Sequence, residues 1–298
     1  MELETRPLQD NFGLEVLDVD LENMDEATFD AVYKLWQQDP LLLFRRQSIT
    51  ESRLVDFSKG FGKLERITRD DMYSPAFPEV IYITGLKRPD GRALGGLGVY
   101  ELHWHHDQIY RVWPATGSIF YATEMPESGG NTWWCNTALG YASLPDDLKA
   151  EIDGKTATAK FGYKSQRSFQ RDFSKDGDRV KVLHDRTPPA THPIVLTHPV
   201  TGEKSTFLDP NKTMAIEGKS EEETQDLLER LFAHIVRDEH IYAHEWRNGD
   251  VVLWDNGRLM HRRDGYDPDI PRFAKRTTVF LKPDDFAVPQ PDAANHGP

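Results

Sequence analysis

The chain has 298 residues, of which 38% are hydrophobic and 29% are charged, a balance typical of a soluble globular protein with enough apolar material for a core. Its formal net charge of −13 at pH 7 argues against non-specific binding to nucleic acid. No apolar run approaches the roughly 20 residues of a membrane-spanning helix. No secretory signal is visible either. The single cysteine, Cys135, excludes an internal disulfide, and together these features predict a cytoplasmic protein.

The first third of the chain predicts short strands that alternate with amphipathic helices. The alternation in residues 12–21 and the apolar run in 41–44 indicate strands, and residues 24–38 have helical spacing. A second helix is expected to begin after the N-cap Thr50 and to end at Gly60 and Gly62. A further strand is predicted over 80–84. The glycine-rich residues 88–98 lack the Lys-Ser/Thr of a phosphate loop and are interpreted as a flexible connector.

Further short strands follow. They are expected at 116–125, after the turn in 128–137, on both sides of a turn at 201–202, and at 249–256 and 276–282. Helices are predicted for 145–152 and, from the capping box of Ser220 and Glu223, for 220–235. The tail from about 283, rich in Pro, Asp and Ala, is expected to be frayed.

Residues 160–192 differ from their surroundings because they are polar, aperiodic and basic. Eight Lys and Arg against four Asp give this segment a net charge of +4 in an acidic chain. It is either a solvated loop or a lid that meets an anionic substrate. No linker or repeat divides the chain, so we expect one domain over 1–298. Its many short strands and few flanking helices favour a β-barrel or a jelly-roll sandwich.

The stretch Trp104-His105-His106-Asp107 carries the candidate chemistry. In an extended strand, His105 and Asp107 would point to the same face and could hold one metal ion. His261 is the best third ligand, and two histidines with one carboxylate are typical of non-haem Fe(II) oxygenases. His103 shares the expected face, so a zinc hydrolase with three histidines stays open at this point.

The chain resembles the TauD/TfdA family of Fe(II)/2-oxoglutarate-dependent dioxygenases over nearly its whole length. The motifs that carry the resemblance are W-H-x-D at 104–107, G-G-N-T at 129–132, W-R-x-G-D-x-V-x-W-D-N at 246–256, the distal His261, and the arginines of PRFAKRTTV. The resemblance implies a double-stranded β-helix fold, also called a jelly-roll or cupin-like core.

The resemblance further implies that His105, Asp107 and His261 bind Fe(II). Arg276 would pair with the distal carboxylate of 2-oxoglutarate, as a guanidinium does with two parallel hydrogen bonds. Thr132 would donate to the same group, and Arg272 would lie near the other carboxylate of the cosubstrate.

The expected activity is the oxidation, favoured as hydroxylation, of a small organic molecule with consumption of O2 and release of succinate and CO2. The presence of the Asp107 carboxylate favours hydroxylation over halogenation. The basic segment and Arg66 predict an anionic or zwitterionic substrate, contacted by Trp104, Arg66, Arg167 and Arg171. A zinc-dependent hydrolase and a non-enzymatic metal-binding barrel are the alternatives. No nucleic-acid or membrane partner is expected, and assembly into a homo-oligomer stays open.

Overall fold

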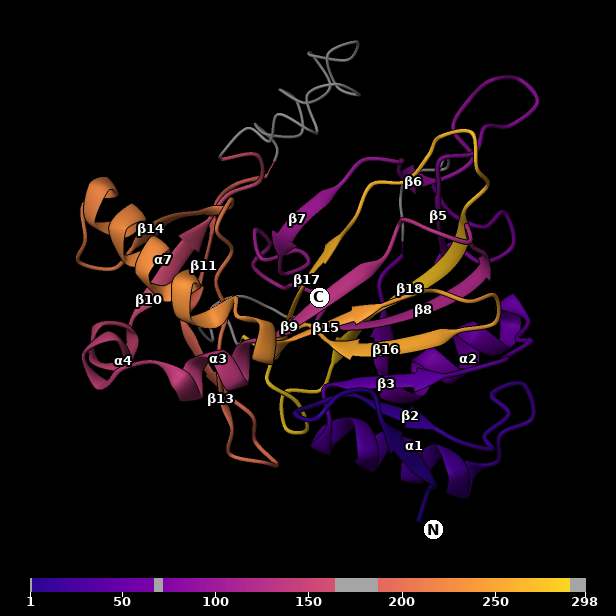
Figure 1. Ribbon diagram of the computed structural model, residues 1–298, viewed down its shortest axis with the longest axis horizontal. Helices are drawn as coiled ribbons and strands as arrows, with labels where there is room; N and C mark the ends of the chain where they lie inside the picture. Colours follow the sequence, from indigo (N-terminus) through magenta and orange to yellow (C-terminus); the bar gives the residue numbers. More distant parts are fainter. Residues whose placement is uncertain (1, 67–71, 164–186, 290–298) are drawn as a thin grey trace.

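The computed structural model describes residues 2–66, 72–163 and 187–289 (Figure 1). Strands outnumber helices within these ranges, so the protein is mainly β with few helices, as the many short strands predicted. In the same ranges, no helix is long and apolar enough to cross a membrane.

The larger sheet takes nine strands from the described residues, in the order β1-β2-β3-β16-β8-β18-β5-β6, with β4 also paired to β18. Only the β2–β3 and β5–β6 pairs are parallel within it. The last strand of the chain therefore lies between much earlier ones. The strands are β1 (Thr5–Pro7), β2 (Leu14–Val16), β3 (Leu41–Phe44), β4 (Gly62–Leu64), β5 (Ile81–Thr84), β6 (Gly96–Leu97), β8 (Gly117–Glu124), β16 (Val251–Asp255) and β18 (Phe273–Leu281).

A four-stranded sheet, called the smaller sheet below, faces the larger one and has the order β15-β9-β17-β7; β11-β10-β14 and β12-β13 form two further sheets in the described part of the chain. Its strands are β7 (Leu102–His105), β9 (Thr132–Asn136), β15 (Ile241–His244) and β17 (Leu259–Arg263). One apolar cluster joins Leu43, Phe120 and Trp254 of the larger sheet to Trp134 and Leu259 of the smaller. The two sheets therefore pack against each other, and residues that alternate along each strand point into the space between them.

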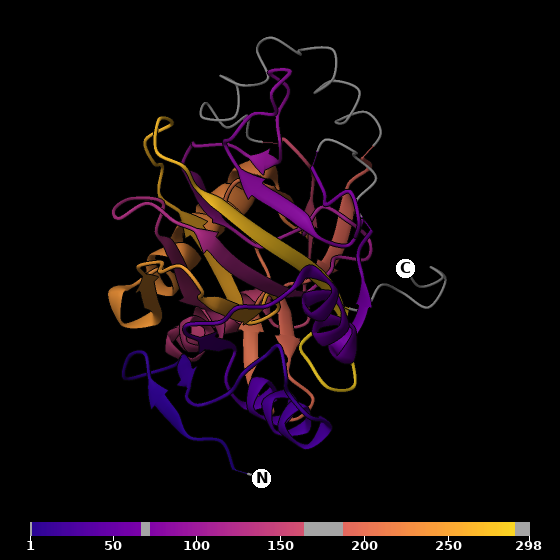
Figure 2. The same ribbon diagram turned by 90° about the vertical axis from the view of Figure 1, so that its right-hand side faces the viewer.

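Helices cover the outer faces of both sheets (Figures 1 and 2). Helices α1 (Glu26–Gln38) and α2 (Glu51–Phe61) bury Trp36 and Phe61 against the larger sheet. On the smaller sheet, α3 (Thr137–Ser143), α4 (Asp146–Ile152) and α7 (Glu221–Ile235) pack around Cys135 and Met260. The remaining elements are β10 (Thr156–Ala159), β11 (Ala190–Pro193), β12 (Val195–Thr197), β13 (Lys204–Thr206), β14 (Thr213–Ile216) and the short 3-10 helix η1 (Asp238–His240).

The predicted helix starts are confirmed. The hydroxyl of Thr50 accepts the backbone N–H of Arg53, and Ser220 and Glu223 form the reciprocal capping box. Of the two glycines predicted to end α2, Gly62 is confirmed as its C-cap, whereas Gly60 does not end the helix, which continues to Phe61. Gly60 instead lets Phe29 of α1 approach closely, since a Cβ there would lie 2.2 Å from its ring.

Two loop predictions need correction. The glycine-rich connector contains β6, whose residues 96–97 pair in parallel with β5. The tail is ordered beyond its expected start at 283: Phe286 is fully buried against Tyr33 and Trp36, and Asp285 accepts a hydrogen bond from the Tyr33 hydroxyl. Composition suggested fraying, but distant aromatic partners hold this segment in place.

Candidate metal centre

The three predicted metal ligands meet in the space between the sheets. Nε2 of His105 lies 3.6 Å from one carboxylate oxygen of Asp107, and Nε2 of His261 lies 3.7 Å from the other. Their ligand atoms lie within 4.8 Å of one another, and no other such group of His, Cys, Asp and Glu occurs in the described ranges. His103 is outside the cluster. The donor set of two imidazoles and one carboxylate fits Fe(II) and leaves further coordination positions open.

The two histidines come from neighbouring strands, and the carboxylate comes from a turn. His105 and His261 are direct partners in the β7–β17 pairing. The expectation that Asp107 continues the strand is wrong, because β7 ends at His105 and Gln108 has a φ of +55°. The turn after the strand swings the Asp107 carboxylate back toward the two imidazoles.

Asn256 fixes this turn. Its side-chain oxygen accepts the backbone N–H of Asp107 at 2.9 Å, and its side-chain nitrogen donates to the Asp107 carbonyl at 3.1 Å. The Asn256 carbonyl also contacts Nδ1 of the buried His106 at 2.7 Å. One side chain therefore joins the segment of Asp107 to the turn that leads to His261.

The electrostatics of the site suit cation binding. Nδ1 of His105 lies 2.7 Å from the His103 carbonyl, so this nitrogen carries the proton and Nε2 is free to coordinate. Burial, followed by the proximity of His105, holds the pKa of His261 well below its usual range, which keeps this imidazole neutral. Burial alone would raise the pKa of Asp107, but the neighbouring Arg276 outweighs it and holds that pKa well below the usual range. The carboxylate is therefore ionised.

Arg276 lies at the metal end of the site. Its Nη2 donates to the Asp107 carboxylate and to the Ser118 hydroxyl, and its guanidinium lies 5.1 Å from the centre of the Trp254 ring. The sequence predicted that Arg276 would bind the distal carboxylate of 2-oxoglutarate, away from the metal. Its contact with the metal ligand Asp107 does not agree with that prediction.

Arg272 lies with Thr132 at the end of the site that is away from the metal ligands. Its side chain is buried, and its Nε and Nη1 have no hydrogen-bond partner among the described residues. Gly130, at φ +65°, makes room for it, since a Cβ there would lie 3.2 Å from Nε of Arg272. The Thr132 hydroxyl accepts a hydrogen bond from Nε1 of Trp246 at 3.0 Å, which leaves its own proton free to donate.

The residues predicted to contact the substrate do not cluster around the metal ligands in the described part of the chain. Trp104 alternates with His105 on β7 and packs on the opposite side of the smaller sheet, near Arg262. Arg66 is exposed and lies 3.8 Å from Glu79. Arg167 and Arg171, with the core of the expected lid, lie outside the described residues.

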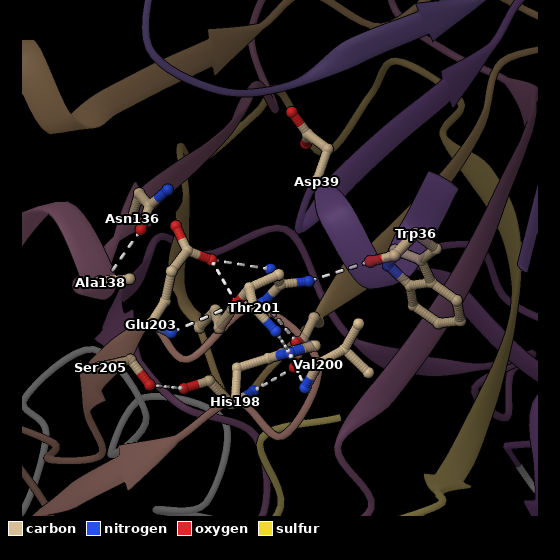
Figure 3. Close-up of polar contacts among 12 residues, drawn as sticks. Trp36, Asp39, Asn136, Ala138, His198, Val200, Thr201, Glu203 and Ser205 are labelled. Atoms are coloured by element: carbon tan, nitrogen blue, oxygen red, sulfur yellow. Dashed lines mark hydrogen bonds and ion pairs between the residues drawn. The ribbon is translucent and has the colours of Figure 1, made fainter. Parts of the chain in front are cut away.

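The turn between β16 and β17, which presents His261, is supported from three sides (Figure 3). The buried Arg258 pairs with Asp255 at 2.8 Å, donates to the Trp36 carbonyl, and lies 3.3 Å from Glu203 of the β12–β13 turn. The Ser205 hydroxyl donates to the Gly257 carbonyl. Asp255, through Arg258, and Asn256, through Asp107, therefore shape the turn that presents His261.

We expect Asn256→Ala to weaken metal binding by about 10- to 100-fold, the usual effect of losing a side chain that orients a ligand. The dissociation constant for Fe(II) without O2 measures this directly. Asn136→Ala is the matched control. It removes an N-cap of α3 and should cost about 1 kcal/mol of stability without changing metal affinity. Unchanged metal binding in Asn256→Ala would contradict the assigned role.

A second prediction concerns Asp39, which is drawn above the contacts of this turn in Figure 3. Burial raises its pKa to about 6, although its carboxylate accepts the backbone N–H groups of Leu41 and Gly13. A raised pKa means that this group destabilises the fold as pH rises from about 4 through 6. Asp39→Asn should therefore gain stability over the native chain in that window, by at most about 3 kcal/mol. Chemical denaturation at several pH values measures the gain, and Asp25→Asn, at the exposed N-cap of α1, should show none.

The comparisons with known proteins agree with this geometry. The family model described as "Taurine catabolism dioxygenase TauD, TfdA family" matches residues 4–278. The chain belongs to the TauD/TfdA family. It is therefore a dioxygenase, an oxidoreductase.

Individual TauD/TfdA proteins resemble it along nearly their whole length. The chain is 29% identical to the alpha-ketoglutarate-dependent 2,4-dichlorophenoxyacetate dioxygenase of Cupriavidus pinatubonensis, over 94% of this chain and 98% of that protein. It is 30% identical to the (S)-phenoxypropionate/alpha-ketoglutarate-dioxygenase of Sphingobium herbicidovorans, over 88% and 89%. The structure of AAD-2 in complex with Mn(II) and N-oxalylglycine superposes with a TM-score of 0.76 at 28% identity and covers 94% of this chain and 97% of that one.

Proposed function

We propose that this TauD/TfdA dioxygenase hydroxylates a small anionic or zwitterionic molecule, with 2-oxoglutarate as cosubstrate and release of succinate and CO2. It is an Fe(II)- and 2-oxoglutarate-dependent enzyme that consumes O2. The observation that carries the proposal is the meeting of His105, Asp107 and His261, with an ionised Asp107 carboxylate and a neutral His261 imidazole. When bound, the iron supplies the oxidising chemistry, and the protein supplies orientation and an open coordination position.

We assign the two arginines in the reverse order from the sequence expectation. Arg272 is proposed to hold the distal carboxylate of 2-oxoglutarate, with the free proton of Thr132 as a further donor. Unpaired buried N–H groups are costly, so a carboxylate at this place would satisfy them. Arg276, hydrogen-bonded to Asp107, is proposed to orient the metal ligand and to attract the negative end of a molecule bound beside it.

Hydroxylation is favoured because Asp107 occupies a coordination position that a halide would need. The basic segment and Arg276, which lies beside the metal ligands, favour a substrate that carries a negative charge. The two relatives described above are named for aryloxy carboxylic acids, which are anionic at neutral pH. We further propose that the chain forms one domain with a double-stranded β-helix core, which the packing of the two sheets supports.

The test is anaerobic. Fe(II) and 2-oxoglutarate are added to metal-free protein, and the visible spectrum is recorded. A weak charge-transfer band is expected, because the keto acid would chelate the iron. The absence of a band, together with tight zinc binding and hydrolytic activity, would favour the zinc hydrolase instead. Succinate release then allows screening of carboxylates, sulfonates and amino acids as substrates.

The basic segment offers a separate prediction. Arg167→Gln with Arg171→Gln should raise KM for the organic substrate and leave KM for 2-oxoglutarate unchanged, since the segment is proposed to meet the substrate. Steady-state kinetics with each substrate varied in turn measures both constants. An effect confined to 2-oxoglutarate would refute the proposed contact.

A further inference from the structure

Arg263 lies in the interior of the site, two residues after His261 on the same strand. Both residues belong to β17, and residues two apart on a strand share a face. In the register with β9, His261 lies opposite Trp134 and Arg263 lies opposite Thr132. Arg263 is therefore in the layer of Thr132, about 7 Å along the strand from the metal ligand. A five-carbon dicarboxylate spans a comparable distance.

The hydrogen bonds of Arg263 leave its charge unpaired. Nη2 donates to the carbonyl of Leu97, at the end of β6, and to those of Gly98 and Tyr100, in the segment between β6 and β7. The residue is only 4% exposed, and its Nε and Nη1 have no partner among the described residues. No described carboxylate forms an ion pair with it.

Arg263 and Arg272 lie on the same aromatic ring. Each guanidinium carbon is 5.4 Å from the centre of the Tyr266 ring, so both buried cations contact this ring. A guanidinium keeps its charge even when it is buried. Both remain charged at neutral pH. Two unpaired buried charges are expensive unless an anion joins them.

We propose that Arg263 is a second anchor for the distal carboxylate of 2-oxoglutarate, beside Arg272 and Thr132. The assignment rests on the proposed position of the cosubstrate. An ionised carboxylate offers about four lone-pair sites, enough for the Thr132 hydroxyl and donors from both guanidinium groups. Arg263 would then join the segment 97–100 to the cosubstrate, since its remaining nitrogen already holds that segment.

The test compares two keto acids. The Fe(II)-loaded protein is titrated calorimetrically, without O2, with 2-oxoglutarate and with 2-oxobutanoate, which lacks the distal carboxylate. Arg263→Gln should weaken 2-oxoglutarate binding by about 10- to 100-fold, as the loss of a charged hydrogen bond does, and change 2-oxobutanoate binding less than about twofold. Equal weakening of both ligands would mean that Arg263 only supports the 97–100 segment, and no weakening of either would also overturn the proposal.

Two further variants keep the outcomes distinct. Arg262→Gln, which removes the same charge from the opposite face of β17, should leave both affinities unchanged. Arg263→Lys retains a charge if the glutamine variant fails to fold, and it should show the same selectivity with a smaller loss. If the native protein binds neither keto acid, the proposed function itself fails. If Arg272→Gln loses 2-oxoglutarate binding while both Arg263 variants behave as the native protein, only the second anchor is wrong.

Discussion

His261→Ala is expected to abolish turnover and to weaken Fe(II) binding by more than about 100-fold, since loss of even an orienting partner of a ligand costs about 10- to 100-fold. The variant leaves one imidazole and one carboxylate, which cannot hold the ion on three sides. The affinity for Fe(II), measured by calorimetry without O2, is the primary readout. His105→Ala and Asp107→Ala should behave in the same way.

Metal loss must be distinguished from loss of the fold. His261 is 6% exposed, and its ring packs against those of His105 and Trp254, so alanine leaves a cavity. The thermal midpoint of the metal-free variant shows whether the fold survives. His103→Ala is the matched control, because His103 lies outside the cluster and its removal should leave metal affinity intact. A folded His261→Ala protein that retains native metal affinity would rule out the assigned triad.

Arg272→Met is expected to have opposite effects on function and stability. The variant removes the cation proposed to hold the distal carboxylate, and breaking such a buried pair costs about 3–5 kcal/mol, or a 100- to several-thousandfold rise in KM for 2-oxoglutarate. The protein without cosubstrate should become no less stable. Methionine fills similar space and removes a buried charge that has no described anionic partner.

Two measurements on the same variant test this reversal. Initial rates at varied 2-oxoglutarate give KM, and chemical denaturation without cosubstrate gives the free energy of unfolding. A marked loss of stability would show that Arg272 is paired within the native fold. Lys275→Met on the adjacent strand β18 is the control, because Lys275 pairs with Glu51 at the surface of α2 and should not affect KM.

The sequence predicted which residues bind the metal better than it predicted the backbone conformation that brings them together. The spacing of His105 and Asp107 suggested a shared strand face, whereas the carboxylate reaches the ion from a turn with a positive φ at Gln108. Arg272 and Arg276 are four residues apart and share a face in any extended strand, so spacing could not tell which lies nearer the metal. That depends on contacts with Asp107 and Gly130, which come from distant segments.

Residues that support the site were missed for a related reason. Trp246 opens the motif at 246–256 and Ser118 stands in none, but no spacing shows the role of either residue, because each acts through one partner far away in the chain. Arg263 did carry a signal, since it follows His261 by two residues in a predictable strand. Similarly, the composition of the tail hid Phe286, whose aromatic partners lie about 250 positions earlier.

The position of β18 constrains how this chain can fold during synthesis. The strand joins β8 to β5, and the tail behind it closes over α1, so the N-terminal half cannot complete its sheet or bury Trp36 until the last elements leave the ribosome. Such long-range pairing slows folding and keeps apolar strand edges exposed for longer. We therefore expect nascent chains that stop before β18 to depend on chaperones, and the metal centre to assemble only after translation of Arg276.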